Sequence, residues 1–196
     1  MSADRFQHHV IWHCSLLASS EHASLFEHED ERRLQGLAVL PHEGTPCHID
    51  YELIIDRDWM PRSSSVTVTL PTQVRRIELR SDRIGHWEVN GSGAPHLDGC
   101  SDVDLGWTPA TNTVPIRRLD LETGDTATIV ASWVRVPELD VIANEQQYTR
   151  LAPDRWRYRS GDYDFELVTD VASGIVLAYG VDLWRAAATD LSRHVP

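Results

Sequence analysis

Apolar and polar residues alternate with a period of two along most of this 196-residue chain. In residues 9–16, Val10, Trp12, Cys14 and Leu16 fall on one face, which is the pattern of a half-buried β-strand. The same alternation, or a run rich in β-branched residues, recurs at 33–40, 49–57, 64–70, 74–80, 126–136, 146–151, 155–159, 163–169 and 174–179. Short turn signals separate these runs, so the sequence predicts an antiparallel sheet.

The length fits a single domain that spans residues 1–196. The number and short spacing of the expected strands are typical of a barrel, a half-barrel or a sandwich. Residues 86–99 predict a hairpin that bends at Asn90-Gly91, because this pair suits a turn with positive φ. One C-terminal helix is expected at 181–193, where apolar residues lie near helical spacing. Residues 20–30 fit a short helix or a strand.

Composition excludes several function classes. The net charge is -12, with no lysine, so neither a phosphate-binding surface for nucleic acid nor a polybasic membrane anchor is expected. Cys14, Cys47 and Cys100 are odd in number and far apart, which predicts no disulfide framework. The N-terminus has no long apolar run, and no stretch approaches the length of a membrane span. We expect a cytoplasmic protein without cofactor or metal.

The most distinctive stretch is DVDLGWTPATNTVPIRRLDL, residues 102–121. In a strand, Asp102 and Asp104 share one face. In the same way, Arg117 would share a face with Leu119 and Leu121, and would point inward with them. A buried Arg needs a carboxylate partner, and the nearest acids in the chain are Asp102 and Asp104. Prolines and Asn112 between the acids and the arginines predict a stiff loop.

Three interpretations of this stretch remain open. The acids and arginines could form a polar floor that holds the head group of a ligand. They could equally form an ion-pair network that only fixes a crossover loop. The Asp pair could also work as general acid and base.

Seven tryptophans are the second unusual feature. They suit either a packed core or a large cavity inside the sheet, in which indole N–H groups can donate hydrogen bonds. Other chemistry has weaker support. His9 and His13 would lie about 13 Å apart in a strand, too far to share a metal. The sequence also lacks GxSxG, GxGxxG and P-loop motifs.

Residues 102–119 resemble a bacterial family labelled "putative glycolipid-binding". The matching motifs are DVDL at 102–105 and TPATNTVPIRRL at 108–119. Further matches, in the same order, are YELIIDRDW at 51–59, VRVPELDV at 134–141, QQYTRL at 146–151 and the run 158–179. The resemblance implies a fold similar to periplasmic lipoprotein carriers, in which a curved antiparallel sheet forms an incomplete barrel around a hydrophobic cavity. Those carriers have signal peptides, and none is recognised here.

The combined expectation is a mainly β, single-domain antiparallel sheet, curved into an incomplete or split barrel around an apolar cavity, with one C-terminal helix. The expected function is non-catalytic binding of an amphiphilic small molecule such as a glycolipid, with Arg117 or Arg118 holding an anionic or sugar head. The candidate ligand-binding residues are Asp102, Asp104, Asn112, Arg117, Arg118, Trp87, Trp107 and Tyr148. The alternatives are a small hydrolase or isomerase that uses the Asp pair in the same cavity, and a structural β scaffold that binds another protein.

Overall fold

The computed structural model describes residues 6–28, 30–82, 84–181 and 183–191. Within them, fifteen strands form one continuous sheet. The strands are β1 Phe6–Cys14, β2 Ser19–Glu27, β3 Glu31–His42, β4 Thr45–Asp56, β5 Pro61–Leu70, β6 Gln73–Ser81, β7 Trp87–Val89, β8 Ser92–Gly93, β9 Asp102–Leu105, β10 Thr126–Arg135, β11 Asp140–Ala152, β12 Arg155–Ser160, β13 Tyr163–Thr169, β14 Val176–Tyr179 and β15 Trp184–Leu191. The described helices are the 3-10 turns η1 Pro95–Leu97 and η2 Ala110–Asn112, and the α-helix α1 Thr113–Leu119.

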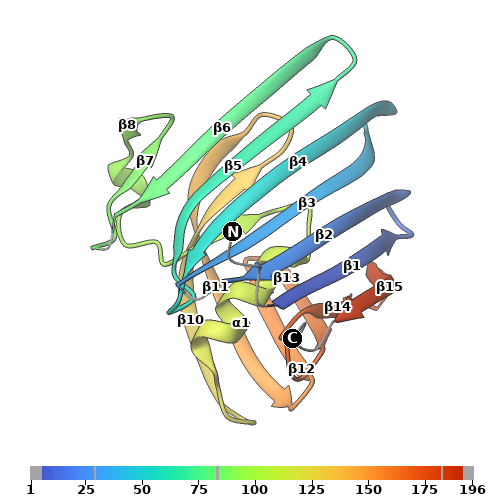
Figure 1. Ribbon diagram of the computed structural model, residues 1–196, viewed down its shortest axis with the longest axis vertical. Coiled ribbons are helices and arrows are strands. Elements are labelled where there is room, and N and C mark those ends of the chain that lie inside the picture. Colours follow the sequence, from blue (N-terminus) through green and yellow to red (C-terminus); the bar gives the residue numbers. More distant parts are fainter. Residues whose placement is uncertain (1–5, 29, 83, 182, 192–196) are drawn as a thin grey trace.

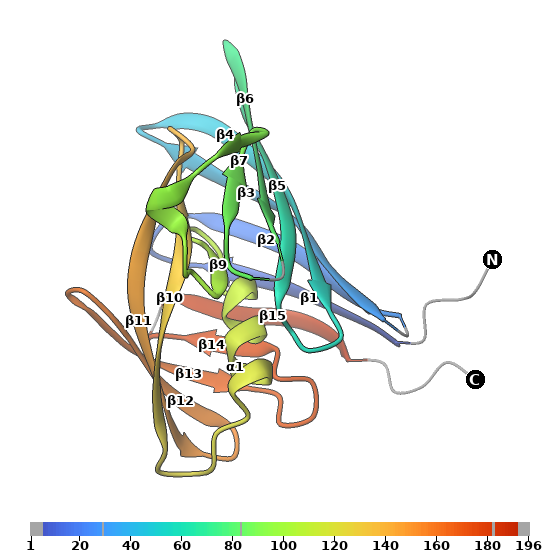
Figure 2. The same cartoon turned by 90° about the vertical axis from the view of Figure 1, so that its left-hand side faces the viewer.

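The strand order explains how the two halves of the chain meet. Strands β1 to β8 lie next to one another in chain order, and β10 to β15 return in order until β15 pairs with β1. The short strand β9 lies at the far edge, parallel to β10. The sheet therefore ends at β8 and β9 and does not close on itself, as the expected incomplete barrel requires. Figure 2 shows its strong curvature, with β1–β6 on one wall and β10–β13 on the other.

The structure confirms one local prediction, the hairpin turn, and decides one alternative that was open. Residues 19–27 form strand β2, which settles the ambiguity over residues 20–30. Asn90 and Gly91 have φ values of 50° and 75° and form the turn between β7 and β8, as the hairpin prediction requires. All three cysteines are buried and free.

The expected helix at 181–193 is wrong for the residues that the structure describes. Residues 184–191 form strand β15, which pairs with both β1 and β14. Trp184 is buried and Ala186 is partly buried, while Arg185 and Ala187 are exposed. The backbone of β15 bonds to the edge of β1, and this non-local pairing overrides the local helix preference.

The helix lies instead at α1, in a segment that was expected to be extended from residue 116 onward. Pro115 is compatible with helix here because it lies in the first turn, where its missing N–H removes no intrahelical bond. The helix ends at Asp120, which adopts a left-handed conformation with φ of 42°. The expected face shared by Arg117, Leu119 and Leu121 therefore does not exist, because residues two apart point in different directions on a helix.

Helix α1 lies between the two walls of the sheet and connects their cores (Figures 1 and 2). Val114 belongs to the large core cluster that includes Val10 and Trp12. Ile116 packs into a second cluster with Trp156 and Leu167 from the C-terminal strands. The helix thus fixes the position of the preceding loop, residues 106–112, inside the concave face of the sheet.

Candidate functional site

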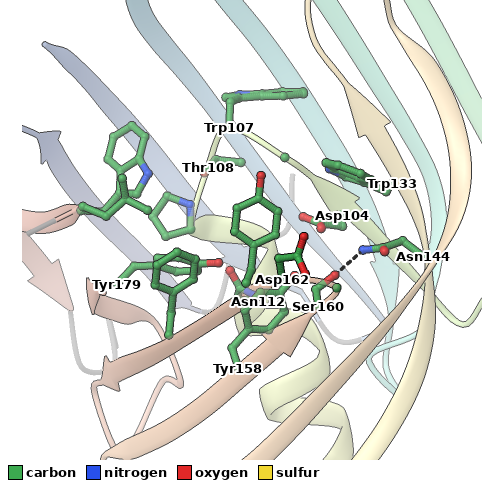
Figure 3. A pocket seen from close by; sticks show the side chains of 17 residues that line it. Asp104, Trp107, Thr108, Asn112, Trp133, Asn144, Tyr158, Ser160, Asp162 and Tyr179 are labelled. Atoms are coloured by element: carbon green, nitrogen blue, oxygen red, sulfur yellow. Dashed lines mark hydrogen bonds between the residues drawn. The ribbon is translucent and has the colours of Figure 1, made fainter. Parts of the chain in front are cut away.

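A cleft of about 430 Å³ lies on the concave side of the sheet, under the loop that precedes α1. Its walls come from β9 to β15 and from residues 106–112, so it depends on strands that are far apart in the sequence. Figure 3 shows the rings of Trp107, Trp133, Tyr158 and Tyr179 around the cleft. Asp104, Asn112 and Asp162 lie between these rings. The lining residues are Asp104, Gly106, Trp107, Thr108, Pro109, Asn112, Trp133, Asn144, Tyr158, Ser160, Gly161, Asp162, Tyr163, Phe165, Tyr179, Leu183 and Trp184.

Aromatic rings dominate the apolar part of the lining. Seven of the seventeen residues are Trp, Tyr or Phe, whereas Leu183 and Pro109 supply the aliphatic surface. Tyr179 lies 6.0 Å from the ring of Tyr158 and 5.2 Å from that of Phe165. Tyr163 stacks on Phe165 with centroids 5.9 Å apart. The expected cavity was apolar, but this cleft combines flat ring surfaces with many polar groups.

The sheet register creates this aromatic wall. Tyr148 of β11 lies opposite Tyr158 of β12, and Tyr158 lies opposite Phe165 of β13. Side chains directly across two antiparallel strands are close neighbours on one face. Three aromatic residues from three strands therefore form a continuous row, which brings Tyr158 and Phe165 to the cleft.

A hydrogen-bonded relay holds Asp104 in place. The amide of Asn112 donates to the hydroxyl of Tyr148 at 2.8 Å, and that hydroxyl donates to the side chain of Gln146 at 3.3 Å. The Gln146 amide then donates to Oδ2 of Asp104 at 2.7 Å. Burial raises the pKa of Asp104 to about 6, although the Gln146 bond opposes this shift. Asp104 is thus a cleft carboxyl that titrates close to neutral pH.

The loop over the cleft is fixed by a second polar cluster. Thr108 Oγ1 donates to Glu21 Oε1 at 2.7 Å, and the Tyr51 hydroxyl donates to the same oxygen. Glu21 is only 1% exposed, and burial raises its pKa to about 7. Its second oxygen, Oε2, has no hydrogen-bond partner among the described residues.

Two further features of this loop shape the cleft. Gly106 is packed so closely that an added Cβ would lie 2.3 Å from Nε1 of Trp133. Trp107 is 6% exposed, and its indole N–H has no acceptor within the described part of the chain. A buried N–H without an acceptor is unfavourable.

The structure brings some of the sequence candidates together. Asp104, Trp107 and Asn112 line the cleft, and Tyr148 lies directly behind it as the partner of Asn112.

The other four candidates do not line the cleft. Asp102 forms a buried ion pair with Arg118, and Trp87 donates its indole N–H to the carbonyl of Cys100 in the core. Arg117 was expected to point inward and pair with an acid. It instead donates to the carbonyl of Ala172 at 2.6 Å and lies over the ring of Trp59, 5.2 Å from its centroid.

Sequence reasoning missed most of the cleft, because the lining residues from Trp133 onward lie beyond the distinctive stretch, on strands β10 to β15 and the turns between them. A signal was present in residues 155–160, RWRYRS, where Trp156, Tyr158 and Ser160 alternate with arginines and occupy the buried face. Asp162, in the turn after β12, and Tyr163, the first residue of β13, carried no signal that distinguished them from an ordinary hairpin.

Neither a membrane-spanning helix nor a metal cluster is found in the portion of the chain described. No helix there is long and apolar enough to cross a bilayer. No group of three or more His, Cys, Asp or Glu side chains in that portion is arranged to hold a metal ion.

Fold and site together define an open, strongly curved antiparallel sheet protein with an aromatic cleft in its concave face. The family model described as "putative glycolipid-binding" matches residues 9–185, and the chain belongs to this family. A DUF1089 family protein from Pseudomonas aeruginosa, known from its crystal structure, has a similar fold and 34% sequence identity. The match covers 84% of this chain and 90% of that one, with a TM-score of 0.74. No protein of curated function matches the chain.

Proposed function

We propose that the chain binds the carbohydrate head of a glycolipid in the cleft beneath residues 106–112, without catalysis. The observation that carries this proposal is the composition of the lining, in which seven aromatic rings accompany six side chains with polar groups. Flat aromatic faces suit the C–H surface of a sugar ring, and the polar groups suit its hydroxyls. The family description is consistent with such a ligand.

The size and chemistry of the cleft favour the head of the ligand over its tail. Its volume of about 430 Å³ lies near the lower end of the range for small-molecule sites, about 300 to 1,000 Å³. Aliphatic side chains are scarce in the lining, whereas an acyl chain would gain most from an extended aliphatic surface. The arginines that were expected to hold an anionic head lie outside the lining.

The test compares ligands that share a tail and differ in the head. Octyl glucoside and sodium octanoate, both below their micellar concentrations, are titrated against the protein while tryptophan fluorescence is recorded. Trp107, Trp133 and Trp184 line the cleft, so we expect octyl glucoside to change the emission and octanoate to have little effect.

A pair of variants locates the binding site. Tyr163→Ala, on the exposed rim of the cleft, should weaken binding of octyl glucoside about tenfold, whereas Leu151→Ala, exposed but outside the lining, should not. Equal responses to both ligands, or equal losses in both variants, would contradict the proposal.

A second candidate function, glycoside hydrolysis, is favoured by one observation. Asp104 has a raised pKa at the cleft wall, and Asp162 supplies a second carboxyl at the same cleft. One protonated and one ionised carboxyl are what a glycosidase needs, to protonate the leaving oxygen and to activate water. Turnover of nitrophenyl glycosides that is lost in Asp104→Asn, with binding retained, would favour this function over simple binding.

A further inference from the structure

We infer that the cleft selects a positively charged ring, an amine-bearing sugar, over neutral and anionic sugars of the same size. This inference rests on the proposed function, because it names the class of head group that the same cleft takes. Its basis is the combination of aromatic rings and carboxylates in the lining, with the lining free of cationic side chains.

The side chains of the lining that can carry a full charge at neutral pH are both acidic. Asp104 and Asp162 are its ionisable carboxyls, and no Arg or His is among its seventeen residues. Asp162 lies in the exposed turn between β12 and β13, where no ion pair with it is found among the described side chains. The neighbouring Asp164 differs, because it pairs with both Arg157 and Arg159. The negative charge of Asp162 is therefore available to a ligand.

The arginines near the cleft are already engaged. Arg118 pairs with the buried Asp102, and Arg117 donates to a backbone carbonyl. Arg135 pairs with Asp140 and lies 5.6 Å from the ring centroid of Trp133. An anionic sugar would therefore meet two carboxylates with no free guanidinium among the lining residues, and like charges at a site disfavour binding.

The aromatic rings add to the attraction for a cation. Trp133, Tyr158 and Tyr179 lie around the same space as the two carboxyls (Figure 3). Trp184 also lines the cleft. An ammonium group over such rings is attracted by their negative faces, and the effect grows when water is excluded. Rings and carboxylates together form a site for an ammonium group that is attached to an apolar ring face.

The neutral polar side chains of the lining point to oxygen atoms on the ligand. Thr108, Asn112, Asn144 and Ser160 bring hydroxyl and amide groups to the cleft. An ammonium group has only donors, whereas sugar hydroxyls can both donate to and accept from such groups. The ligand is therefore an amine-bearing sugar ring instead of a simple amine.

The test uses methyl glycosides of glucosamine, glucose and glucuronic acid, which share one ring and differ in charge. Dissociation constants are measured at neutral pH and low salt, by tryptophan fluorescence and by ligand-observed NMR. We expect the glucosamine glycoside to bind about tenfold more tightly than the glucose glycoside, and the glucuronide more weakly than both. Choline serves as an ammonium ion without a sugar ring.

Matched variants on one hairpin assign the effect to the cleft. Asp162→Asn should reduce the preference for glucosamine over glucose to about threefold or less, whereas Asp164→Asn should leave it unchanged. Both residues are exposed, so neither change threatens the fold.

Each outcome separates this inference from the proposed function. Equal affinities for glucosamine and glucose glycosides would overturn the charge selectivity and leave sugar binding intact. A preference for the glucuronide would also overturn it. Choline binding as tightly as glucosamine would overturn the requirement for a ring. Binding of none of the sugars, with octyl glucoside also inactive, would defeat the proposed function itself.

Discussion

Thr108 Oγ1 donates a 2.7 Å hydrogen bond to Oε1 of Glu21, although the two residues are 87 positions apart in the chain. Thr108 belongs to the loop over the cleft, and Glu21 lies in β2 on the N-terminal wall of the sheet. The same carboxyl oxygen accepts a bond from the Tyr51 hydroxyl. This buried cluster anchors the loop over the cleft to the N-terminal wall of the sheet. The protonation state of Glu21 therefore affects the stability of the fold and the position of this loop.

Glu21→Gln should make the protein more stable at alkaline pH. Burial raises the pKa of Glu21 from 4.5 to about 7, so the folded state favours the protonated acid. The contribution of Glu21 to stability is complete below about pH 4.5 and is lost as the pH rises through about 7. Gln is a neutral isostere that keeps the acceptor for Thr108 and Tyr51. Urea unfolding should show a gain of roughly 3 kcal/mol over the parent protein well above neutral pH.

The gain should shrink to near zero below about pH 4.5, because the parent carboxyl is then neutral in both the folded and the unfolded state. Glu145→Gln, at an exposed position of β11, is the control and should follow the parent protein at every pH. A variant that is less stable than the parent at alkaline pH would show that the ionised carboxylate is needed for the fold.

Arg118→Ala should destabilise the protein by about 3 to 5 kcal/mol, because it leaves the buried carboxylate of Asp102 without its counter-charge. Arg117→Ala should cost clearly less, since it removes one bond to a carbonyl and the contact with Trp59. The two neighbouring variants are compared by thermal and urea unfolding. An equal loss in both would mean that the helix, and not the Asp102 ion pair, determines the effect.

Gly106→Ala should distort the cleft. The new methyl group would lie 2.3 Å from Nε1 of Trp133, so the indole or the loop must move. Overpacking of this kind typically costs about 1 to 3 kcal/mol. We expect a change in tryptophan emission and weaker binding of octyl glucoside. Gly93→Ala is the matched control, because nothing lies within 4 Å of the added Cβ at that position. Unchanged binding in Gly106→Ala would show that Trp133 does not contribute to the site.

Gln146→Leu should raise the pKa of Asp104 further above its value of about 6. The Gln146 amide stabilises the charged carboxylate, and its loss removes the hydrogen bond that opposes the effect of burial. Carbon-13 NMR titration of the carboxyl group measures this pKa directly. Tyr148→Phe breaks the relay one step earlier and should give a smaller shift in the same direction. An unaltered Asp104 pKa in Gln146→Leu would show that the relay does not position this carboxyl.

The candidate site was predictable only in part. Residues 102–112 carried a distinctive combination of two acids, a proline and Asn112. Three residues of this region that were singled out, Asp104, Trp107 and Asn112, line the cleft. Arg117 was misplaced because strand periodicity was applied to a segment that forms a helix. Asp162 and Tyr163 had no local feature that marked them, since they enter the cleft only through the pairing of β12 with β13.

The sequence by itself determined the β character of the chain and many of its turns. Alternation with period two is a local property that places every second side chain on one face. A strand can therefore be predicted from this pattern without knowing which strand it pairs with. The Asn90-Gly91 turn is local in the same sense, because it needs only two residues that tolerate positive φ.

Only the tertiary structure decided the conformation of residues 184–191, the position of the helix and the shape of the cleft. Residues 184–191 became a strand because the edge of β1 offered them backbone partners, and α1 formed where two core clusters receive its apolar side chains. The cleft depends on the register of seven strands and on a bond between Thr108 and Glu21. Register and burial are set by contacts between distant segments, which no single stretch of the chain contains.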